Sequence, residues 1–69
     1  MVEVFKTNVQ DNIQADQVIS TFQCHFPDLF FNFDLEDQDK ILRVEGIKIL
    51  NRKIITSLVS QGYFCEVLL

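Results

Sequence analysis

The residues of this chain that are best suited to bind a soft metal ion are its two cysteines and its one histidine. Cys24 and His25 are neighbours in a predicted helix, where adjacent side chains diverge, so we expect Cys24 to be a surface thiol rather than half of a ligand pair. Cys65 alternates with Tyr63 and Val67 and is expected to be a small buried side chain. A disulfide is not expected, because the two cysteines fall toward opposite ends of the predicted sheet.

A second group of chemically active residues is the run of carboxylates at Asp34, Glu36, Asp37 and Asp39. A calcium loop would need a glycine at its sharp turn and a bidentate glutamate at its end, and this segment has neither. Nothing nearby is expected to bury these groups or to raise a pKa, as acid–base catalysis would require. We therefore predict a solvated hairpin turn here and no enzymatic activity for the chain.

The overall composition limits the classes of partner. The 69 residues suffice for a single domain, 1–69, and the net charge of −4 with a pI near 4.6 argues against nucleic acid as a partner. The basic residues are scattered apart from Arg52 and Lys53, and no apolar run is long enough to span a membrane, so no membrane partner is expected. The opening residues alternate like a strand and lack a signal-peptide pattern. The expected location is the cytoplasm, with both thiols reduced.

Hydrophobic periodicity predicts the elements that position these residues. A β-rich segment at 2–7 is the first strand. Asp11 is the expected cap of a helix whose apolar residues recur at the helical period until Pro27 stops it. Residues 29–35 alternate as a second strand, and the acidic segment 36–39 forms the turn that follows.

The second half of the chain supplies the other two strands and the second helix. Residues 41–44 are the third strand, which Gly46 ends. Asn51 is the expected cap of a second helix, Gly62 its C-terminal stop, and 63–69 the fourth strand. The order βαββαβ predicts an α+β, ferredoxin-like fold, in which two helices cover one face of a four-stranded antiparallel sheet.

Several local motifs resemble the heavy-metal-associated domain of copper chaperones and copper-transporting ATPases. The segment 18–22 is similar to the apolar stripe of that family's first helix, and Pro27-Asp28-Leu29 stands where the family has Pro-Gly-Val. Segment 33–36, Phe-Asp-Leu-Glu, resembles its Val-Asp-Leu-Glu, and Leu58 through Gly62-Tyr63 matches its Ile-x-x-x-Gly-Tyr. The resemblance covers nearly the whole chain and implies the same fold.

The family's metal-binding motif, Met-x-Cys-x-x-Cys, is missing from the matching loop. The resemblance places Asp11 and Gln14 at the cysteine positions and Val9 at the methionine. Neither a carboxylate nor an amide is a soft ligand of the kind that Cu(I) prefers. We therefore expect a degenerate metal site that binds no metal and no cofactor, with Asp11 acting as a helix cap.

The open face of the predicted sheet is the remaining candidate surface. If Val2 and Val4 point toward the helices, their neighbours and the alternate residues of the other strands point away. The large apolar side chains then expected on the open face are Phe5, Phe30, Ile41, Phe64 and Leu68. A patch of roughly several hundred Å² marks a contact surface on many proteins, although scattered surface hydrophobicity is common on small domains.

These observations favour a small non-enzymatic binding module that acts through protein contacts, either with itself as a homo-oligomer or with an unknown protein. The alternative is a weak copper or zinc carrier that uses Cys24, His25 or Cys65 as non-standard ligands. An RNA-recognition motif would need aromatic residues on its central strands and a basic surface. An acylphosphatase would need an arginine and glycines in the first loop, and residues 7–14 contain neither. An amino-acid-binding regulatory domain shares the fold order but has no supporting motif here.

Overall fold

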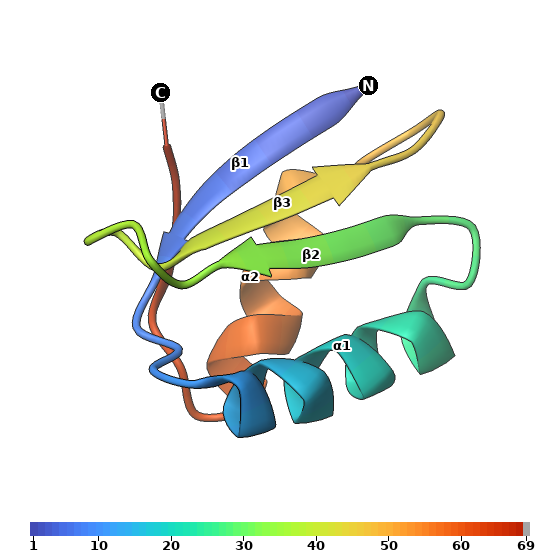
Figure 1. Ribbon diagram of the computed structural model, residues 1–69. Coiled ribbons are helices and arrows are strands. Elements are labelled where there is room, and N and C mark those ends of the chain that lie inside the picture. Colours follow the sequence, from blue (N-terminus) through green and yellow to red (C-terminus); the bar gives the residue numbers. More distant parts are fainter. Residues whose placement is uncertain (69) are drawn as a thin grey trace.

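The computed structural model describes residues 1–68, and within them it contains four strands and two helices. The elements are β1 (Val2–Thr7), α1 (Asn12–His25), β2 (Phe30–Asp34), β3 (Ile41–Glu45), α2 (Asn51–Ser60) and β4 (Cys65–Val67). The strands form one antiparallel sheet in the order β2-β3-β1-β4, and both helices lie on the same side of it (Figure 1). The predicted α+β, ferredoxin-like fold is confirmed.

A single hydrophobic core fills the space between the sheet and the helices. Its largest fully buried side chains, each less than 2% exposed, are Phe5, Phe22, Leu42, Ile54, Leu58, Val9, Val18 and Val44. The rings of Phe22 on α1 and Phe31 on β2 stack with their centroids 4.6 Å apart and their planes 4° from parallel. This aromatic pair fixes α1 beneath the edge of the sheet that β2 forms.

The predicted orientation of the first strand was wrong. Phe5 is 0% exposed and points into the core, whereas Val2 is 45% exposed. Phe5 pairs with Leu42 of β3 and Val67 of β4, and side chains directly opposite each other share a face of the sheet. The inward positions of β1 therefore alternate around Phe5 and include Glu3 and Thr7, whose polar groups hid the pattern in the sequence.

The helix ends lie where the sequence predicted them, except for the start of α2. The side chain of Asp11 accepts a hydrogen bond from the backbone N–H of Gln14, so the predicted cap of α1 is confirmed. Asn51 does not cap α2: it is the first helical residue, Leu50 stands at the cap position, and no side chain caps this end. The side chain of Asn51 instead donates to Glu3 Oε1 at 2.6 Å, which ties α2 to β1.

The C-terminal end of α2 is closed by a glycine turn. Gly62 has φ +96°, a left-handed conformation that other residues adopt only with strain. Its N–H donates to Val59 O at 3.0 Å, and the N–H of Tyr63 donates to Leu58 O at 3.2 Å. This is the pairing of the Schellman motif, which satisfies the last carbonyls of the helix and confirms Gly62 as its stop.

The predicted strand limits differ slightly from those observed. β2 begins at Phe30 and ends at Asp34, one residue inside each predicted end, and β3 extends one residue further, to Glu45. β4 covers only Cys65–Val67, and the predicted last residue of that strand, Leu69, lies outside the described residues. No helix among residues 1–68 is long and apolar enough to cross a membrane.

Candidate functional site

The loop between β1 and α1, where the resemblance places a metal site, is held together by its own hydrogen bonds. Asp11 Oδ1 accepts from Gln14 N at 2.9 Å, and Gln14 Oε1 accepts from Gln10 N at 2.9 Å. Val9 is 0% exposed and belongs to the core. The polar groups of Asp11 and Gln14 therefore organise the start of the helix. Within residues 1–68, no group of three or more His, Cys, Asp or Glu side chains is placed to hold a metal ion.

Thr7 joins this loop to the β2–β3 turn. The Thr7 hydroxyl donates to the carbonyl of Lys40 and accepts from the N–H of Val9 at 3.2 Å, and the Thr7 N–H donates to Asp39 O at 3.0 Å. The Thr7 side chain is buried, so these bonds satisfy a polar group that would otherwise destabilise the core. The two loops thus form one rigid end of the sheet.

The two cysteines lie in opposite environments, and both are free. Cys24 is exposed, as predicted for a surface thiol, and Cys65 is buried, as predicted for a small core residue. Desolvation by burial raises the pKa of the Cys65 thiol from its ordinary value of 9.0 to about 12. A thiol with this pKa stays protonated at neutral pH and is a poor nucleophile and metal ligand.

The acidic β2–β3 turn is organised by its own carboxylates, as expected for a solvated turn. Asp37 Oδ1 accepts from Asp39 N at 2.8 Å, and Asp34 Oδ1 accepts from Glu36 N at 3.3 Å. Lys40 ends the turn with φ +47°, and its ammonium group donates to Leu35 O at 2.9 Å. Asp39 also forms an ion pair with Lys6 at 3.6 Å.

The open face of the sheet carries apolar side chains at its two edges and on the central strand β1, where Val2 and Val4 point outward. The charged side chains of Arg43 and Glu45 on β3 separate them from the β2 edge. Phe30, on the edge strand β2, is 75% exposed, whereas Phe64 and Leu68 flank β4 at the other edge and are 46% and 40% exposed. Ile41 is half-buried, and the predicted member Phe5 is absent because it faces the core. The five residues therefore do not form one continuous patch.

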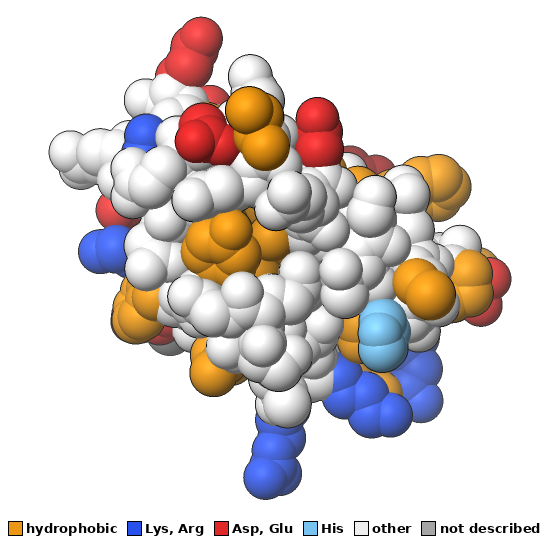
Figure 2. Space-filling view, turned by 90° about the horizontal axis from the view of Figure 1, so that it is seen from below, with side chains coloured by type: hydrophobic (Ala, Val, Ile, Leu, Met, Phe, Trp, Pro, Cys, Tyr) orange, Lys and Arg blue, Asp and Glu red, His pale blue; other side chains and the backbone are white. Residues whose placement is uncertain are grey.

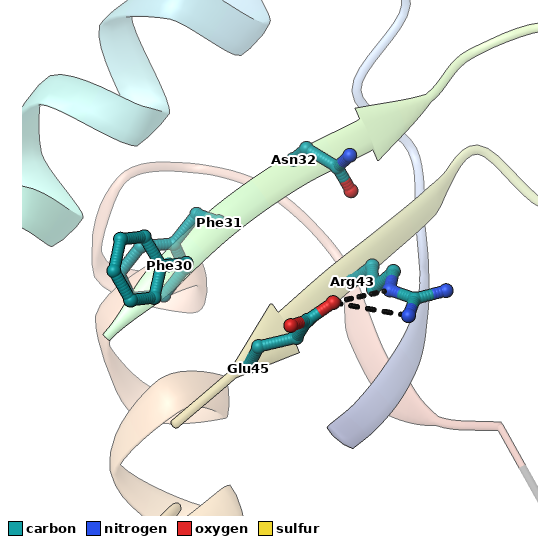
Figure 3. A pocket seen from close by; sticks show the side chains of 5 residues that line it. All are labelled: Phe30, Phe31, Asn32, Arg43 and Glu45. Carbon is teal, nitrogen blue, oxygen red and sulfur yellow. Dashed lines mark hydrogen bonds and ion pairs between the residues drawn. The ribbon is translucent and has the colours of Figure 1, made fainter. Parts of the chain in front are cut away.

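A hollow of about 300 Å³ lies beside Phe30 on this face (Figure 3). It is lined by Phe30, Phe31, Asn32, Arg43 and Glu45. Arg43 and Glu45 lie on the same face of β3, and the guanidinium contacts Glu45 Oε1 through both Nε, at 3.1 Å, and one terminal nitrogen, at 3.0 Å. This half-exposed ion pair lies beside an exposed aromatic ring, an arrangement that can receive both apolar and polar groups of a partner.

A second surface, on the helix side, was not predicted. A groove of about 350 Å³ runs between the end of α1 and the start of α2 and is lined in part by His25, Phe26, Lys48 and Lys53. Figure 2 shows the pale-blue imidazole of the chain's histidine beside a group of blue Lys and Arg side chains. The fold gathers here basic residues that lie apart in the sequence, and for this reason the sequence pattern alone did not reveal them.

Comparison with known proteins identifies no relative: no protein-family model, no curated protein and no solved structure matches the chain. The candidate site therefore rests on the geometry of the chain itself. Among the surfaces described above, the β2 side of the open sheet face has the most exposed aromatic side chain, next to a hollow and the Arg43–Glu45 ion pair.

Proposed function

We propose that the chain is a small non-enzymatic binding module that acts through protein–protein contacts, and that its simplest partner is a second copy of itself. The observation that carries this proposal is Phe30, which is 75% exposed on an edge strand. Burying a phenylalanine side chain contributes about 1.5–3 kcal/mol, so an aromatic ring in this position favours association. The adjacent Arg43–Glu45 pair carries both signs of charge, so it adds no net charge beside this ring.

Sedimentation of the reduced protein over a range of concentrations tests this proposal. The expected result is reversible association that Phe30→Glu weakens about tenfold or more, because the substitution removes apolar area and introduces a charge. Val59→Glu is the matched control, since Val59 is 55% exposed on α2, which packs on the β4 side of the sheet away from β2, and receives the same charge. A monomer at every concentration, or equal effects of the two substitutions, would overturn the proposal.

We also propose that the chain is a degenerate heavy-metal-associated domain that works in the cytoplasm without a metal, a nucleic acid or a membrane partner. The element order supports the relationship, and the use of Asp11 and Gln14 in loop hydrogen bonds supports the loss of the metal site. Titration of the reduced protein with Cu(I) or Zn(II) is expected to give no tight one-to-one complex. Stoichiometric binding that is lost when Cys24, His25 and Cys65 are replaced by alanine would favour the metal carrier instead.

A further inference from the structure

The backbone hydrogen bonds of the sheet determine which groups are free at its β2 edge. Met1 N donates to Gly46 O at 2.7 Å and Gly46 N donates to Met1 O at 3.1 Å, so these two residues are a hydrogen-bonded pair of the β1–β3 ladder. Because such pairs alternate along an antiparallel ladder, the even-numbered residues of β3 face β1 and its odd-numbered residues face β2. Arg43 therefore pairs through hydrogen bonds with Asn32.

The same alternation leaves the N–H and C=O groups of Phe31 and Phe33 pointing outward from the sheet. Within residues 1–68, these outward-pointing N–H and C=O groups make no hydrogen bond. The next outward-facing residues each have one backbone group engaged: Leu29 N donates to Phe26 O at 3.1 Å, and Leu35 O accepts from Lys40 Nζ at 2.9 Å. The residues with both outward groups free are thus Phe31 and Phe33, which are symmetric about Asn32.

The β2 edge also lacks several of the features that normally prevent strands from pairing between molecules, and its one charged residue, Asp34, stands at its end. Its sequence, Phe-Phe-Asn-Phe-Asp, has no proline and no lysine, and its pairing with β3 continues without a bulge from Phe30 to Asp34. Aromatic residues favour the extended conformation. The other edge of the sheet, β4, has only three residues. The β2 edge is consequently the better template for an added strand.

We propose that two copies of the chain pair through their β2 strands, antiparallel, about a two-fold axis that passes beside Asn32. This inference rests on the self-association proposed above and specifies how it occurs. The N–H and C=O of Phe31 pair with the C=O and N–H of Phe33 in the second copy, and the reciprocal bonds follow from the symmetry. The outward N–H and C=O groups of Phe31 and Phe33 are then satisfied in both copies, and the two sheets become one continuous sheet.

This register also matches the side chains. Phe31 and Phe33 face the helices in both copies, so pairing them extends the two cores toward each other. On the open face, Phe30 lies opposite Asp34 of the second copy, so the carboxylates of the two Asp34 side chains do not meet. The two α1 helices, each packed under β2, come side by side.

Disulfide trapping in the full-length chain tests both the pairing and its register. In the proposed dimer the two Asn32 residues form a non-hydrogen-bonded pair with Cα atoms about 4.5 Å apart, a separation that a disulfide can bridge. In a Cys24→Ala background, Asn32→Cys is expected to yield a disulfide-linked dimer under mild oxidation. The control Asp34→Cys, also at an exposed position of β2, is expected to yield little disulfide-linked dimer, because residue 34 lies opposite residue 30 of the second copy and not opposite residue 34.

Two further measurements complete the test. A mixture of Phe30→Cys and Asp34→Cys is expected to form the mixed disulfide in preference to either homodimer. Hydrogen exchange at the amides of Phe31 and Phe33 is expected to slow as the wild-type protein is concentrated, and Phe64→Glu, at the other edge, is expected to leave this protection intact. If the wild type associates but these traps and amides show no preference, the β2 pairing is wrong. If the wild type never associates, the proposed function fails as well.

Discussion

Two phenylalanines of the sheet lie in opposite environments, and this difference has a direct energetic consequence. Phe5 is 0% exposed in the core and Phe30 is 75% exposed on the open face. Phe5→Ala is expected to lower the free energy of unfolding by about 3–5 kcal/mol, since it removes buried apolar area and leaves a cavity. Phe30→Ala is expected to lower it by less than about 1 kcal/mol, because only a quarter of the side chain is removed from water in the monomer.

These losses are large relative to the total stability expected for a domain of this size, about 3–10 kcal/mol. Phe5→Ala can therefore leave too little folded protein for a complete unfolding curve. The milder variant Phe5→Leu, expected to lose about 1–2 kcal/mol, keeps the comparison measurable. If Phe30→Ala lowered the free energy of unfolding as much as Phe5→Leu or more, the inward face of β1 would have been misassigned.

Urea unfolding followed by circular dichroism measures the difference. The variants are compared at concentrations where sedimentation shows only monomer, so that association does not add to the apparent stability of the wild type. With a slope of about 1 kcal/mol per molar urea, the midpoint for Phe5→Leu is expected to fall by about 1–2 M and that for Phe30→Ala by less than about 1 M.

Three other predictions follow from the termini of the helices and from the buried thiol. Asp11→Ala is expected to lower the free energy of unfolding by about 1 kcal/mol by removing the α1 cap, whereas Asp16→Ala, at an exposed helical position, is expected to change it little in the same urea assay. Gly62→Ala is expected to cost about 1 kcal/mol because of its φ of +96°, and Gly62→Asn less, so equal losses would contradict a conformational cause. The raised pKa of Cys65, about 12 against 9.0 when unfolded, means that the thiol's contribution is fully present below pH 9 and is lost as pH rises to 12. Stability in that window is expected to fall by up to about 1.4 kcal/mol per pH unit more steeply in the wild type than in Cys65→Ala, and parallel pH profiles would contradict this.

Hydrophobic patterning was sufficient to predict the order of the elements and most of their ends. The apolar stripe of α1, the cap at Asp11 and the stop at Gly62 are local signals, and each acts through residues within one helical turn. The fold follows from these signals because few arrangements of four strands and two helices bury all the apolar faces.

The orientation of β1 was not predictable by the same means. Inward-facing Glu3 and Thr7 are polar, and only their long-range bonds, to Asn51 and to Lys40, explain why the sheet tolerates them there. Because the alternation has a period of two residues, a wrong choice at one position reverses the whole strand. The candidate contact surface changed accordingly: Phe5 was lost from it, Ile41 lies half-buried on the central strand β3, and the other three residues are divided between the two edges.

The hydroxyl of Thr7 connects two loops that are distant in the sequence. Because this one side chain bonds to Lys40 in the β2–β3 turn and to Val9 in the β1–α1 loop, neither loop can change its length without disturbing the other. Insertions in relatives of this chain should then occur in the two loops together or in neither. At the far end of the sheet the α1–β2 and β3–α2 connections are linked by packing instead, because Gly46 lies so close to Leu29 that any side chain at position 46 would displace it.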